Sequence, residues 1–409
     1  MGIPTAFAPA RPQRWHLPPS SALPVIVPAL AVVAACYAAF VGWCAWRTDR
    51  APRAAPPPAD GHLPAVAVLV AARDEAHGIG RCLDALLAQD YPADRLTILV
   101  ADDHSTDRTA EIVRRYEAQT RRLALAGAVD EPEPMPETPE VRYVRVPDPT
   151  SPLRGKALAI HTAAEHTDAP LLLITDADCA PAPGWARGLV AGMGDGDGLV
   201  GGLTLMQTET TFGEAQSLDW AFLLGVASAL TESGFPATAM GNNLAIRREA
   251  YEAVGGYPGV GFSVTEDHAL FSAIATRTPW RLRFPLRPET LVWTLPARSL
   301  GHAYRQRRRW ARGGLNAGPV LWAAYVLAHL AHLIPLLALA VAPLAGLGAL
   351  AVKMGADALH LRAVLRRGGG GRLSARAFLL FEAWLFAYMS TLPLALLLAP
   401  RIRWKGRLH

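Results

Sequence analysis

Three pairs of acidic side chains follow short apolar runs that have the composition of buried strands. The pairs are Asp74 and Glu75, Asp102 and Asp103, and Asp176 and Asp178. If these runs are parallel strands of one sheet, the carboxylates gather at the edge where ligands bind in open α/β folds. Gathered carboxylates repel one another unless a cation, sugar hydroxyls or base N–H groups compensate them. A divalent metal bound together with a nucleotide is the economical explanation.

The segment "TDADC", residues 175–179, is the best candidate for the metal site. Two carboxylates two residues apart allow one to face a ribose and the other to face a hard cation that also binds diphosphate oxygens. Taken alone, an Asp-x-Asp pair is equally typical of a turn. In "ADDHSTD", residues 101–107, Asp103 is the better ligand candidate, whereas Ser105 and Asp107 are expected to cap the following helix.

A fourth acidic pair, Glu266 and Asp267 in "TEDHAL", begins an apolar helix after the segment "GGYPGVGFSV". Acidic residues there can simply stabilise the N-terminus of the helix. A carboxylate at such a position can also act as a general base that accepts a proton from a reacting hydroxyl. The functional interpretation gives that role to Asp267.

The segment "QRRRW", residues 306–310, combines amide, guanidinium and indole groups just before a long apolar stretch. Arginines at a membrane border are commonly topology signals. An arginine can also bind phosphate oxygens in a bidentate manner, and a tryptophan face is a common surface for stacking sugars. The segment is therefore a candidate for contact with a sugar phosphate.

These side chains need a sheet that brings the strand ends together. Apolar runs at residues 65–72, 96–102, 141–146 and 170–178 predict strands, and leucines at 83, 86 and 87 and the segment 108–119 predict helices between them. This alternation predicts an α/β domain with a mostly parallel sheet and helices on both faces. The acidic, proline-rich segment 130–140 is expected to be a surface loop.

The N-terminal region predicts a membrane anchor. Residues 22–46 carry no charge and are long enough to cross a hydrocarbon layer of about 30 Å as a helix. A signal peptide is the alternative, but its apolar core spans only about 7–15 residues. Residues 1–21 are then a tail and residues 47–63 a Pro/Ala linker. Arginines after the helix outnumber those before it, which places the following domain in the cytoplasm.

The C-terminal region predicts further spans. No charge occurs from Ala317 to Val352, and the prolines divide this stretch into expected helices at 317–335 and 337–362. Lys353 and Asp357, four residues apart, are expected to neutralise each other. A stretch at 377–399 predicts a transmembrane or re-entrant helix before the basic tail 400–409. Four full crossings would place that tail outside, against the basic-residue rule, so one of these helices is expected not to cross.

Composition agrees with a membrane protein. The 409 residues are 51% apolar and only 18% charged, whereas ordinary domains are roughly 25% charged. This composition excludes a disordered or coiled-coil chain. The net charge of +5 includes the arginines of residues 305–312, which are too few and too close to the apolar stretch for a nucleic-acid surface. The four cysteines show no paired spacing, so neither a disulfide framework nor a zinc site is expected.

Seven segments together carry a family resemblance. The segments "VAARDEAHGIGRCLDALLAQDYP", "ADDHSTDRTAEI", "GKALAIHTA", "TDADC", "GNNLAIRREAYEAVGGY", "TEDHAL" and "QRRRW" stand in the order and approximate spacing of the membrane-bound family 2 glycosyltransferases. The chain resembles cellulose, hyaluronan and poly-N-acetylglucosamine synthases over about residues 64–312. The combination is far more specific than any one segment.

The resemblance implies a GT-A fold over residues 64–300 and an interfacial segment over 301–316. It implies a metal-dependent hexosyltransferase that uses a nucleotide sugar, usually a UDP-sugar, and inverts the anomeric carbon. The implied nucleotide-sugar ligands are Ala72, Arg73, Glu75, Asp103, Lys156 and Asp176, and Asp176 and Asp178 would hold Mg²⁺ or Mn²⁺. Glu266 and Asp267 would be catalytic, with Asp267 as the base. Gly241, Asn242, Gln306, Arg309 and Trp310 would contact the acceptor or the diphosphate.

Two questions of function stay open at this level. "QRRRW" is typical of processive polysaccharide synthases, whereas the small number of apolar helices favours transfer of a sugar to a lipid-linked or growing glycan acceptor. A non-catalytic nucleotide-sugar-binding membrane protein is the alternative of another class, although it would be expected to lack some of these acidic residues. The expected location is the plasma (inner) membrane, with several crossings and a cytoplasmic catalytic domain.

Overall fold

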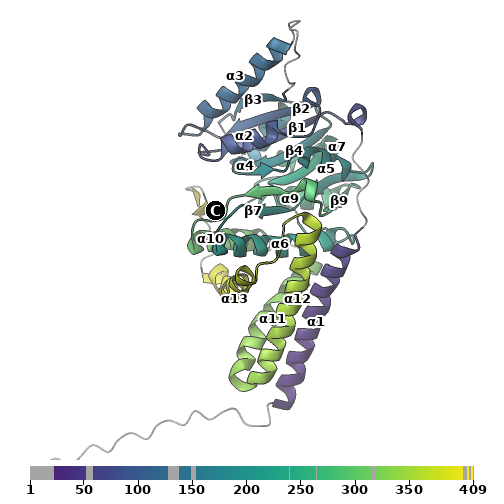
Figure 1. Cartoon of the computed structure of the whole chain (residues 1–409), viewed down its shortest axis with the longest axis vertical. Coiled ribbons are helices and arrows are strands. Elements are labelled where there is room, and N and C mark those ends of the chain that lie inside the picture. The colour runs from purple at the N-terminus through teal and green to yellow at the C-terminus, as the bar shows by residue number, and fades with distance from the viewer. Residues whose placement is uncertain are drawn as a thin grey trace, which may run out of the picture.

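A computed structural model of the chain describes residues 23–51, 59–127, 138–148, 153–238, 240–263, 265–314, 318–398, 403–404 and 407–408 (Figure 1). The expected N-terminal tail, most of the acidic loop and most of the basic tail lie outside the described residues. A short pairing of β11 (Arg403–Trp404) with β12 (Arg407–Leu408) is described near the C-terminus.

A seven-stranded sheet in the order β3-β2-β1-β4-β8-β6-β9 forms the centre of the larger part of the molecule (Figure 1). Strands β1 (Val66–Ala72), β2 (Leu96–Asp102), β3 (Glu140–Arg145) and β4 (Leu171–Asp176) are parallel and confirm the four predicted strands. Strand β8 (Asn243–Arg247) runs antiparallel between β4 and β6 (Asp197–Gly201), and β9 (Arg281–Arg283) pairs with β6 in parallel. The predicted mostly parallel α/β sheet is confirmed.

Helices cover both faces of this sheet because its central strands are apolar on both sides. One face packs on α2 (Ile79–Leu87), α3 (Thr109–Gly127) and α5 (Trp185–Ala191). The other packs on α4 (Lys156–Glu165), α7 (Arg248–Ala253), α8 (Gly256–Val260) and α9 (Glu266–Arg277). A smaller sheet joins β5 (Ala180–Pro181), β10 (Val292–Thr294) and β7 (Thr204–Met206).

Three long helices run side by side away from the sheet: α1 (Leu23–Asp49), α11 (Pro319–Val341) and α12 (Pro343–Gly368) (Figure 1). Between this bundle and the sheet lie α6 (Thr211–Thr231) and α10 (Leu300–Gly313), and α13 (Ala375–Leu398) packs against both. In Figure 1, α13 is seen nearly end-on, so it lies across the direction of the bundle. Helices α1, α11, α12 and α13 are all long and apolar enough to cross a membrane.

The boundary predicted between the two C-terminal spans was wrong. Helix α11 continues through Pro335 to Val341, and the break falls at Ala342, directly before Pro343. A proline inside a helix removes only one N–H donor, and the apolar packing of α11 retains the helix there. Pro343 instead occupies the first turn of α12, where no N–H is needed. Helix α12 also extends beyond the predicted residue 362 to Gly368, and α1 continues to Asp49, past the predicted end at 46.

A buried polar cluster joins the apolar helices. Lys353 Nζ lies 2.9 Å from Asp357 Oδ2, which confirms the predicted pair, and it also contacts Glu382 of α13. The hydroxyl of Tyr37, on α1, donates to Asp357 Oδ1 at 2.8 Å. The three charged side chains are all nearly inaccessible to solvent. The sequence contained Glu382 without indicating its partner, because that partner lies on another helix.

Replacing Lys353 with methionine should destabilise the helical bundle strongly. The variant leaves two carboxylates buried without their cation, which in comparable pairs costs about 3–5 kcal/mol. Thermal unfolding in detergent should show a markedly lower Tm. The combined variant Lys353→Met, Asp357→Asn and Glu382→Gln carries no buried charge and should recover part of the loss. A triple variant no more stable than the single one would show that the unpaired charge is not the cause.

Candidate active site

A cavity of about 720 Å³ lies at the carboxyl ends of β1, β2 and β4 and is closed by the N-terminus of α9 and by α10. Its lining includes all fourteen residues that the family resemblance assigned to the site: Ala72, Arg73, Glu75, Asp103, Lys156, Asp176, Asp178, Gly241, Asn242, Glu266, Asp267, Gln306, Arg309 and Trp310. Asp74 and Asp102, which belong to the predicted acidic pairs, are not among its lining residues. The fourteen residues come from segments that are as much as 238 positions apart in the chain, and the sheet together with α9 and α10 brings them into one cavity.

Some lining residues belong to no motif in the sequence. They include Arg154, Trp220, Met240, Arg298 and His302. Trp220 lies in the middle of α6, an apolar helix whose pattern predicts only packing. Only its tertiary position, beside Trp310 with 5.2 Å between ring centroids, places it at the site.

The ends of β1 and β2 form one wall of the cavity. The guanidinium of Arg73 lies 3.1 Å from Asp103 Oδ2, and the backbone N–H of Asp103 donates to the Ala72 carbonyl. The backbone N–H of Glu75 donates to Thr109 Oγ1 at 2.8 Å. The loops after these strands are therefore fixed, and Asp103 stays at the surface of the cavity.

The capping predictions for this region had mixed outcomes. Asp107 Oδ1 accepts a hydrogen bond from the N–H of Thr109, the first residue of α3, as expected for a capping side chain. Ser105 does not cap the helix: its hydroxyl donates to Asp102 Oδ1 and accepts from the N–H of Asp74. The prediction for Ser105 was wrong because its hydroxyl binds Asp102 and the N–H of Asp74 in the neighbouring loop instead of the helix N-terminus.

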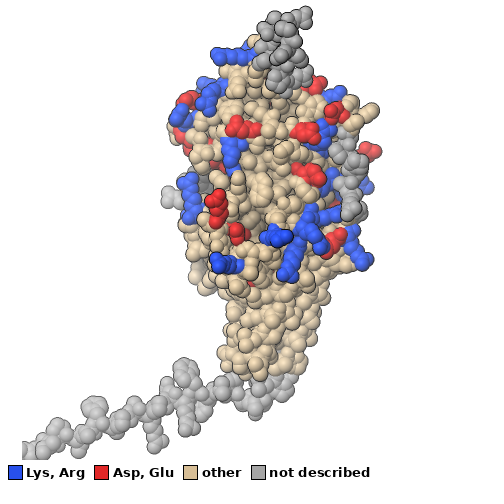
Figure 2. Space-filling view, viewed as in Figure 1, with Lys and Arg blue, Asp and Glu red and all other residues tan. Residues whose placement is uncertain are grey.

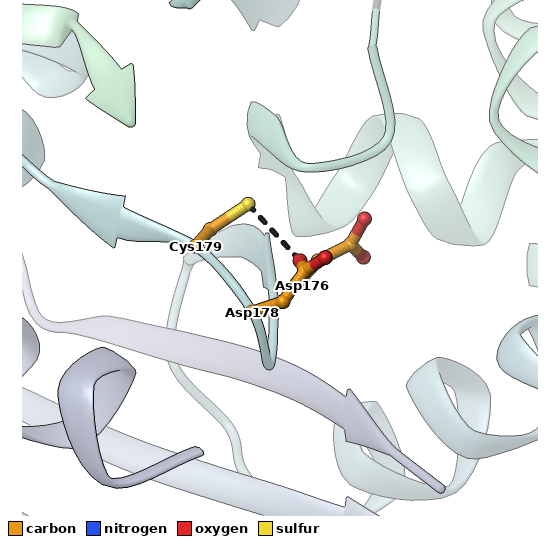
Figure 3. Close-up of side chains that lie close together, drawn as sticks. All are labelled: Asp176, Asp178 and Cys179. Atoms are coloured by element: carbon orange, nitrogen blue, oxygen red, sulfur yellow. Dashed lines mark hydrogen bonds between the residues drawn. The ribbon is translucent and has the colours of Figure 1, made fainter. Parts of the chain in front are cut away.

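Asp176, Asp178 and Cys179 bring three potential metal ligands within 4.8 Å of one another (Figure 3). Burial, and then the negative charges of Asp176 and Glu75, raise the pKa of Asp178 to about 6. A divalent cation would relieve this repulsion. The thiol of Cys179 is fully buried and points to Asp178 Oδ1 at 3.5 Å. Because a thiol is a poor ligand for hard cations, the two carboxylates are the ligands that fit Mg²⁺ or Mn²⁺.

Lys156 lies between Asp176 and the acidic pair Glu266 and Asp267. Its Nζ lies 2.5 Å from Asp176 Oδ1, donates to the Gly241 carbonyl at 2.9 Å and lies 3.8 Å from Glu266. Burial opposes its charge, but Asp176, Glu266 and Asp267 together hold the pKa of Lys156 above its ordinary value. The ammonium group is therefore a stable positive charge beside Asp176, suited to attract an anionic ligand.

Asp267 is held in a defined orientation by two backbone donors. The N–H of Gly241 donates to Asp267 Oδ2 at 2.8 Å, and the N–H of His268 donates to Asp267 Oδ1 at 2.8 Å. Its neighbour Glu266 has a raised pKa because of burial and the adjacent charge of Asp267. A carboxylate fixed in this way, at the wall of a cavity, is suited to accept a proton from a bound hydroxyl.

A methyl group at position 241 should disturb this carboxylate. A Cβ on Gly241 would lie 2.7 Å from the Cβ of Asp267, closer than van der Waals contact allows. Small displacements of a reacting group reduce rates steeply, so Gly241→Ala should lower kcat about 10- to 100-fold while donor affinity changes little. Steady-state kinetics would measure this. Gly348→Ala, where a Cβ meets no atom within 4 Å, is the matched control. Equal kcat values in both variants would contradict the steric argument.

Helix α10 is fixed to α6 by an ion pair that the sequence did not predict. Arg307 Nε and Nη2 lie 2.7 Å and 2.5 Å from Asp219 Oδ2 on α6, and both side chains are buried. Trp384 and Tyr388 of α13 donate to the same carboxylate. The Arg307 guanidinium also lies 4.3 Å from the ring centroid of Trp310. This network orients α10 so that Gln306, Arg309 and Trp310 line the cavity.

Asn242 lies in the same wall but its side chain is already engaged. It is buried, and its Oδ1 accepts from Thr204 Oγ1 at 2.9 Å. Its carbonyl oxygen accepts from Thr175 Oγ1, next to Asp176. The bond to Thr175 connects the start of β8 to the end of β4, just before the turn with Asp176 and Asp178, so Asn242 shapes the cavity through its backbone more than through its amide group.

Two family models match the chain. The model of "Glycosyl transferase family 2" matches residues 67–255, and that of "Glycosyl transferase family group 2" matches residues 171–400, more than half of the chain. Together they extend from β1 through α13 and include the whole cavity described above.

The chain is also similar to curated proteins and to a solved structure that are named as glycosyltransferases. The chain is 26% identical to Glycosyltransferase AglE of Haloferax volcanii over 62% of this chain and 74% of that protein. It is 26% identical to Probable glycosyltransferase YdaM of Bacillus subtilis over 61% of this chain and 55% of that protein. The structure of mannosyltransferase PcManGT from Pyrobaculum calidifontis, in complex with GDP-Man and Mn²⁺, aligns over 92% of this chain and 99% of its own, with 25% identity and a TM-score of 0.56.

Proposed function

The chain belongs to glycosyl transferase family group 2, and from this premise we propose that it is a metal-dependent, inverting hexosyltransferase with a membrane-bound acceptor. As a family 2 glycosyltransferase with a GT-A fold, it transfers a sugar from a nucleotide sugar. The observation that carries the proposal is one cavity lined by carboxylates at the strand ends, by Asp267 at the start of α9 and by Arg309 of α10.

The residues fit a single displacement. The acceptor hydroxyl loses its proton to Asp267 as its oxygen attacks the anomeric carbon, and the bond to the nucleoside diphosphate breaks. Attack from the face opposite the leaving group inverts the anomeric centre, and only one base is required. Lys156 and Arg309 stabilise the negative charge that accumulates on the diphosphate. A Mg²⁺ or Mn²⁺ ion at Asp176 and Asp178 would supply further charge stabilisation there.

The nucleotide is proposed to lie along the β1 and β2 ends. Ala72, Arg73, Glu75 and Asp103 would contact its base and ribose, and Asp176 its diphosphate side. The family resemblance favours a UDP-sugar, whereas PcManGT was solved with GDP-Man, so both bases belong in the test. Gly241, Asn242, Gln306 and Trp310 would border the acceptor.

The membrane arrangement follows from charge distribution. Figure 2 shows charged residues over the part formed by the sheet and none on the visible face of the protruding bundle. Basic residues mark the sheet end of both α1 and α12: Arg47 and Arg50 on one side, Arg366 and Arg367 on the other. By the positive-inside rule, we place the catalytic domain in the cytoplasm at the plasma (inner) membrane, with α1, α11 and α12 crossing. With α13 lying across the bundle, in or near the interface, the basic tail also stays cytoplasmic.

An assay with a donor panel tests the function. The purified protein is incubated with radiolabelled UDP- and GDP-sugars, Mn²⁺ or Mg²⁺ and a total membrane lipid extract, and lipid-extractable label is separated from polymer. We expect metal-dependent label in the lipid fraction from one donor. Label in a high-molecular-weight fraction would support the processive synthase instead. Consumption of no donor in the panel, with nucleotide binding intact, would favour the non-catalytic binding protein.

A further inference from the structure

A second cavity lies between α1, α6, α11 and α13, on the side of the active site that faces the helical bundle. We call it the lower cavity, and the active-site cavity the upper cavity. The volume of the lower cavity is about 330 Å³, within the range of small-molecule sites. Most of its wall is apolar and includes Phe40, Val41, Leu224, Leu321 and Leu385. Leu223, Trp322 and Tyr325 belong to this wall and are also partly exposed on the outside of the helices, so the cavity opens toward the apolar surface of the bundle.

The two cavities meet at the proposed base. Trp220, Met240, Thr265, Asp267 and Trp310 line both of them. A molecule in the lower cavity can therefore place its end group beside Asp267 while the nucleotide sugar occupies the upper cavity. This continuity distinguishes the lower cavity from an ordinary packing defect between membrane helices.

Two side chains that line the lower cavity carry buried N–H donors with no hydrogen-bond partner among the described residues. They are Trp220 Nε1 and Arg307 Nη1, on side chains that are each 5% exposed. An unsatisfied buried donor costs about 1–3 kcal/mol, so such groups usually await a ligand or a water. Trp220 and Arg307 both contact Trp310, at the junction with the upper cavity. A ligand with oxygen acceptors at that junction would satisfy them.

The chemistry of the wall favours a hydrocarbon chain over a glycan. A polysaccharide in the lower cavity would bury many hydroxyls against leucine, valine and phenylalanine side chains, and each buried hydroxyl without a partner is costly. An acyl or isoprenoid chain has no hydrogen-bonding group to bury, so it can move from the apolar bilayer into the apolar cavity without this cost. The unsatisfied nitrogens near Trp310 match the oxygen-rich head of the same molecule.

Building on the proposed function, we propose that the lower cavity holds the apolar chain of a membrane amphiphile, the acceptor, and presents its head-group hydroxyl or phosphate to Asp267. The nitrogens of Trp220 and Arg307 donate to oxygens of the head group. Entry is lateral, from the bilayer, past the partly exposed residues of α6 and α11. The acceptor is thereby selected by its chain and held at a fixed depth below the donor.

Photolabelling in lipid nanodiscs tests this inference. Two diazirine probes are used, a diacylglycerol and a polyprenyl phosphate with the diazirine in the apolar chain, so that a neutral and an anionic head are compared. Ala324→Trp fills the cavity, whereas its neighbour Ala323 is exposed and outside the lining, so Ala323→Trp is the matched control. If Ala324→Trp does not fold, as judged by size-exclusion chromatography and nucleotide binding, Ala328→Trp replaces it.

We expect at least one probe to label peptides of α6, α11 or α13 that line the cavity. Ala324→Trp should reduce this labelling about tenfold or more, and Ala323→Trp should leave it within about twofold of the parent. Labelling spread over the outer face of the bundle, and equal in all three proteins, would overturn the inference. Cavity labelling that depends on Ala324 but comes without sugar transfer from any donor would support the lipid site and count against the proposed function alone.

Discussion

Replacing Asp267 with asparagine should lower kcat for sugar transfer by about 10²–10⁴-fold, the usual contribution of a general base. The amide cannot take the proton of the acceptor hydroxyl. Affinity for the nucleotide sugar should change little, because the proposed nucleotide contacts lie on the β1, β2 and β4 side of the cavity. Single-turnover kinetics with the active donor, combined with nucleotide titration, would separate the two quantities.

Glu266→Gln is the matched control for that measurement. Glu266 is adjacent in sequence and lines the same cavity, but it lies 3.8 Å from Lys156 and we assign it a supporting electrostatic role. Its substitution should cost less than that of Asp267. A larger loss in Glu266→Gln than in Asp267→Asn would transfer the role of base to Glu266.

Removing the metal site should have an effect of similar size. Asp178→Asn, or chelation of divalent ions in the parent protein, should lower activity by about 10²–10³-fold, because a bound cation supplies several kcal/mol of charge stabilisation. Added Mn²⁺ should restore the chelated parent but not the variant. Because the pKa of Asp178 is raised to about 6 without metal, protons compete with the ion, and apparent Mn²⁺ affinity should fall as the pH drops through 6.

Cys179→Ala separates the carboxylates from the thiol. The thiol lies in the same three-residue cluster, but hard cations prefer oxygen, so this variant should keep its response to Mn²⁺ within a few-fold of the parent. Titration of Mn²⁺ against activity, and calorimetric titration with nucleotide, would measure it. Loss of the metal response in Cys179→Ala, but not in Asp178→Asn, would mean that a softer metal is bound through sulfur.

Local patterns identified most of the secondary structure. The valine- and leucine-rich runs that form β1, β2 and β4 are apolar on both faces. This pattern is typical of strands in a sheet that is covered on both sides. The limits of the apolar helices were less predictable. Pro335 and Pro343 have the same local chemistry, and only packing decided that the chain breaks at the second of them.

Residue types and order in the sequence were sufficient to indicate a family 2 glycosyltransferase, to locate its acidic turns and to predict that they share one edge of a sheet. The reason is that the ends of strands, the starts of helices and the charges of side chains depend on a few neighbouring residues in the sequence. Contacts between distant helices leave no such local record. The pairing of Arg307 with Asp219, the position of Trp220 beside Trp310 and the apolar cavity below Asp267 were decided only when the chain folded.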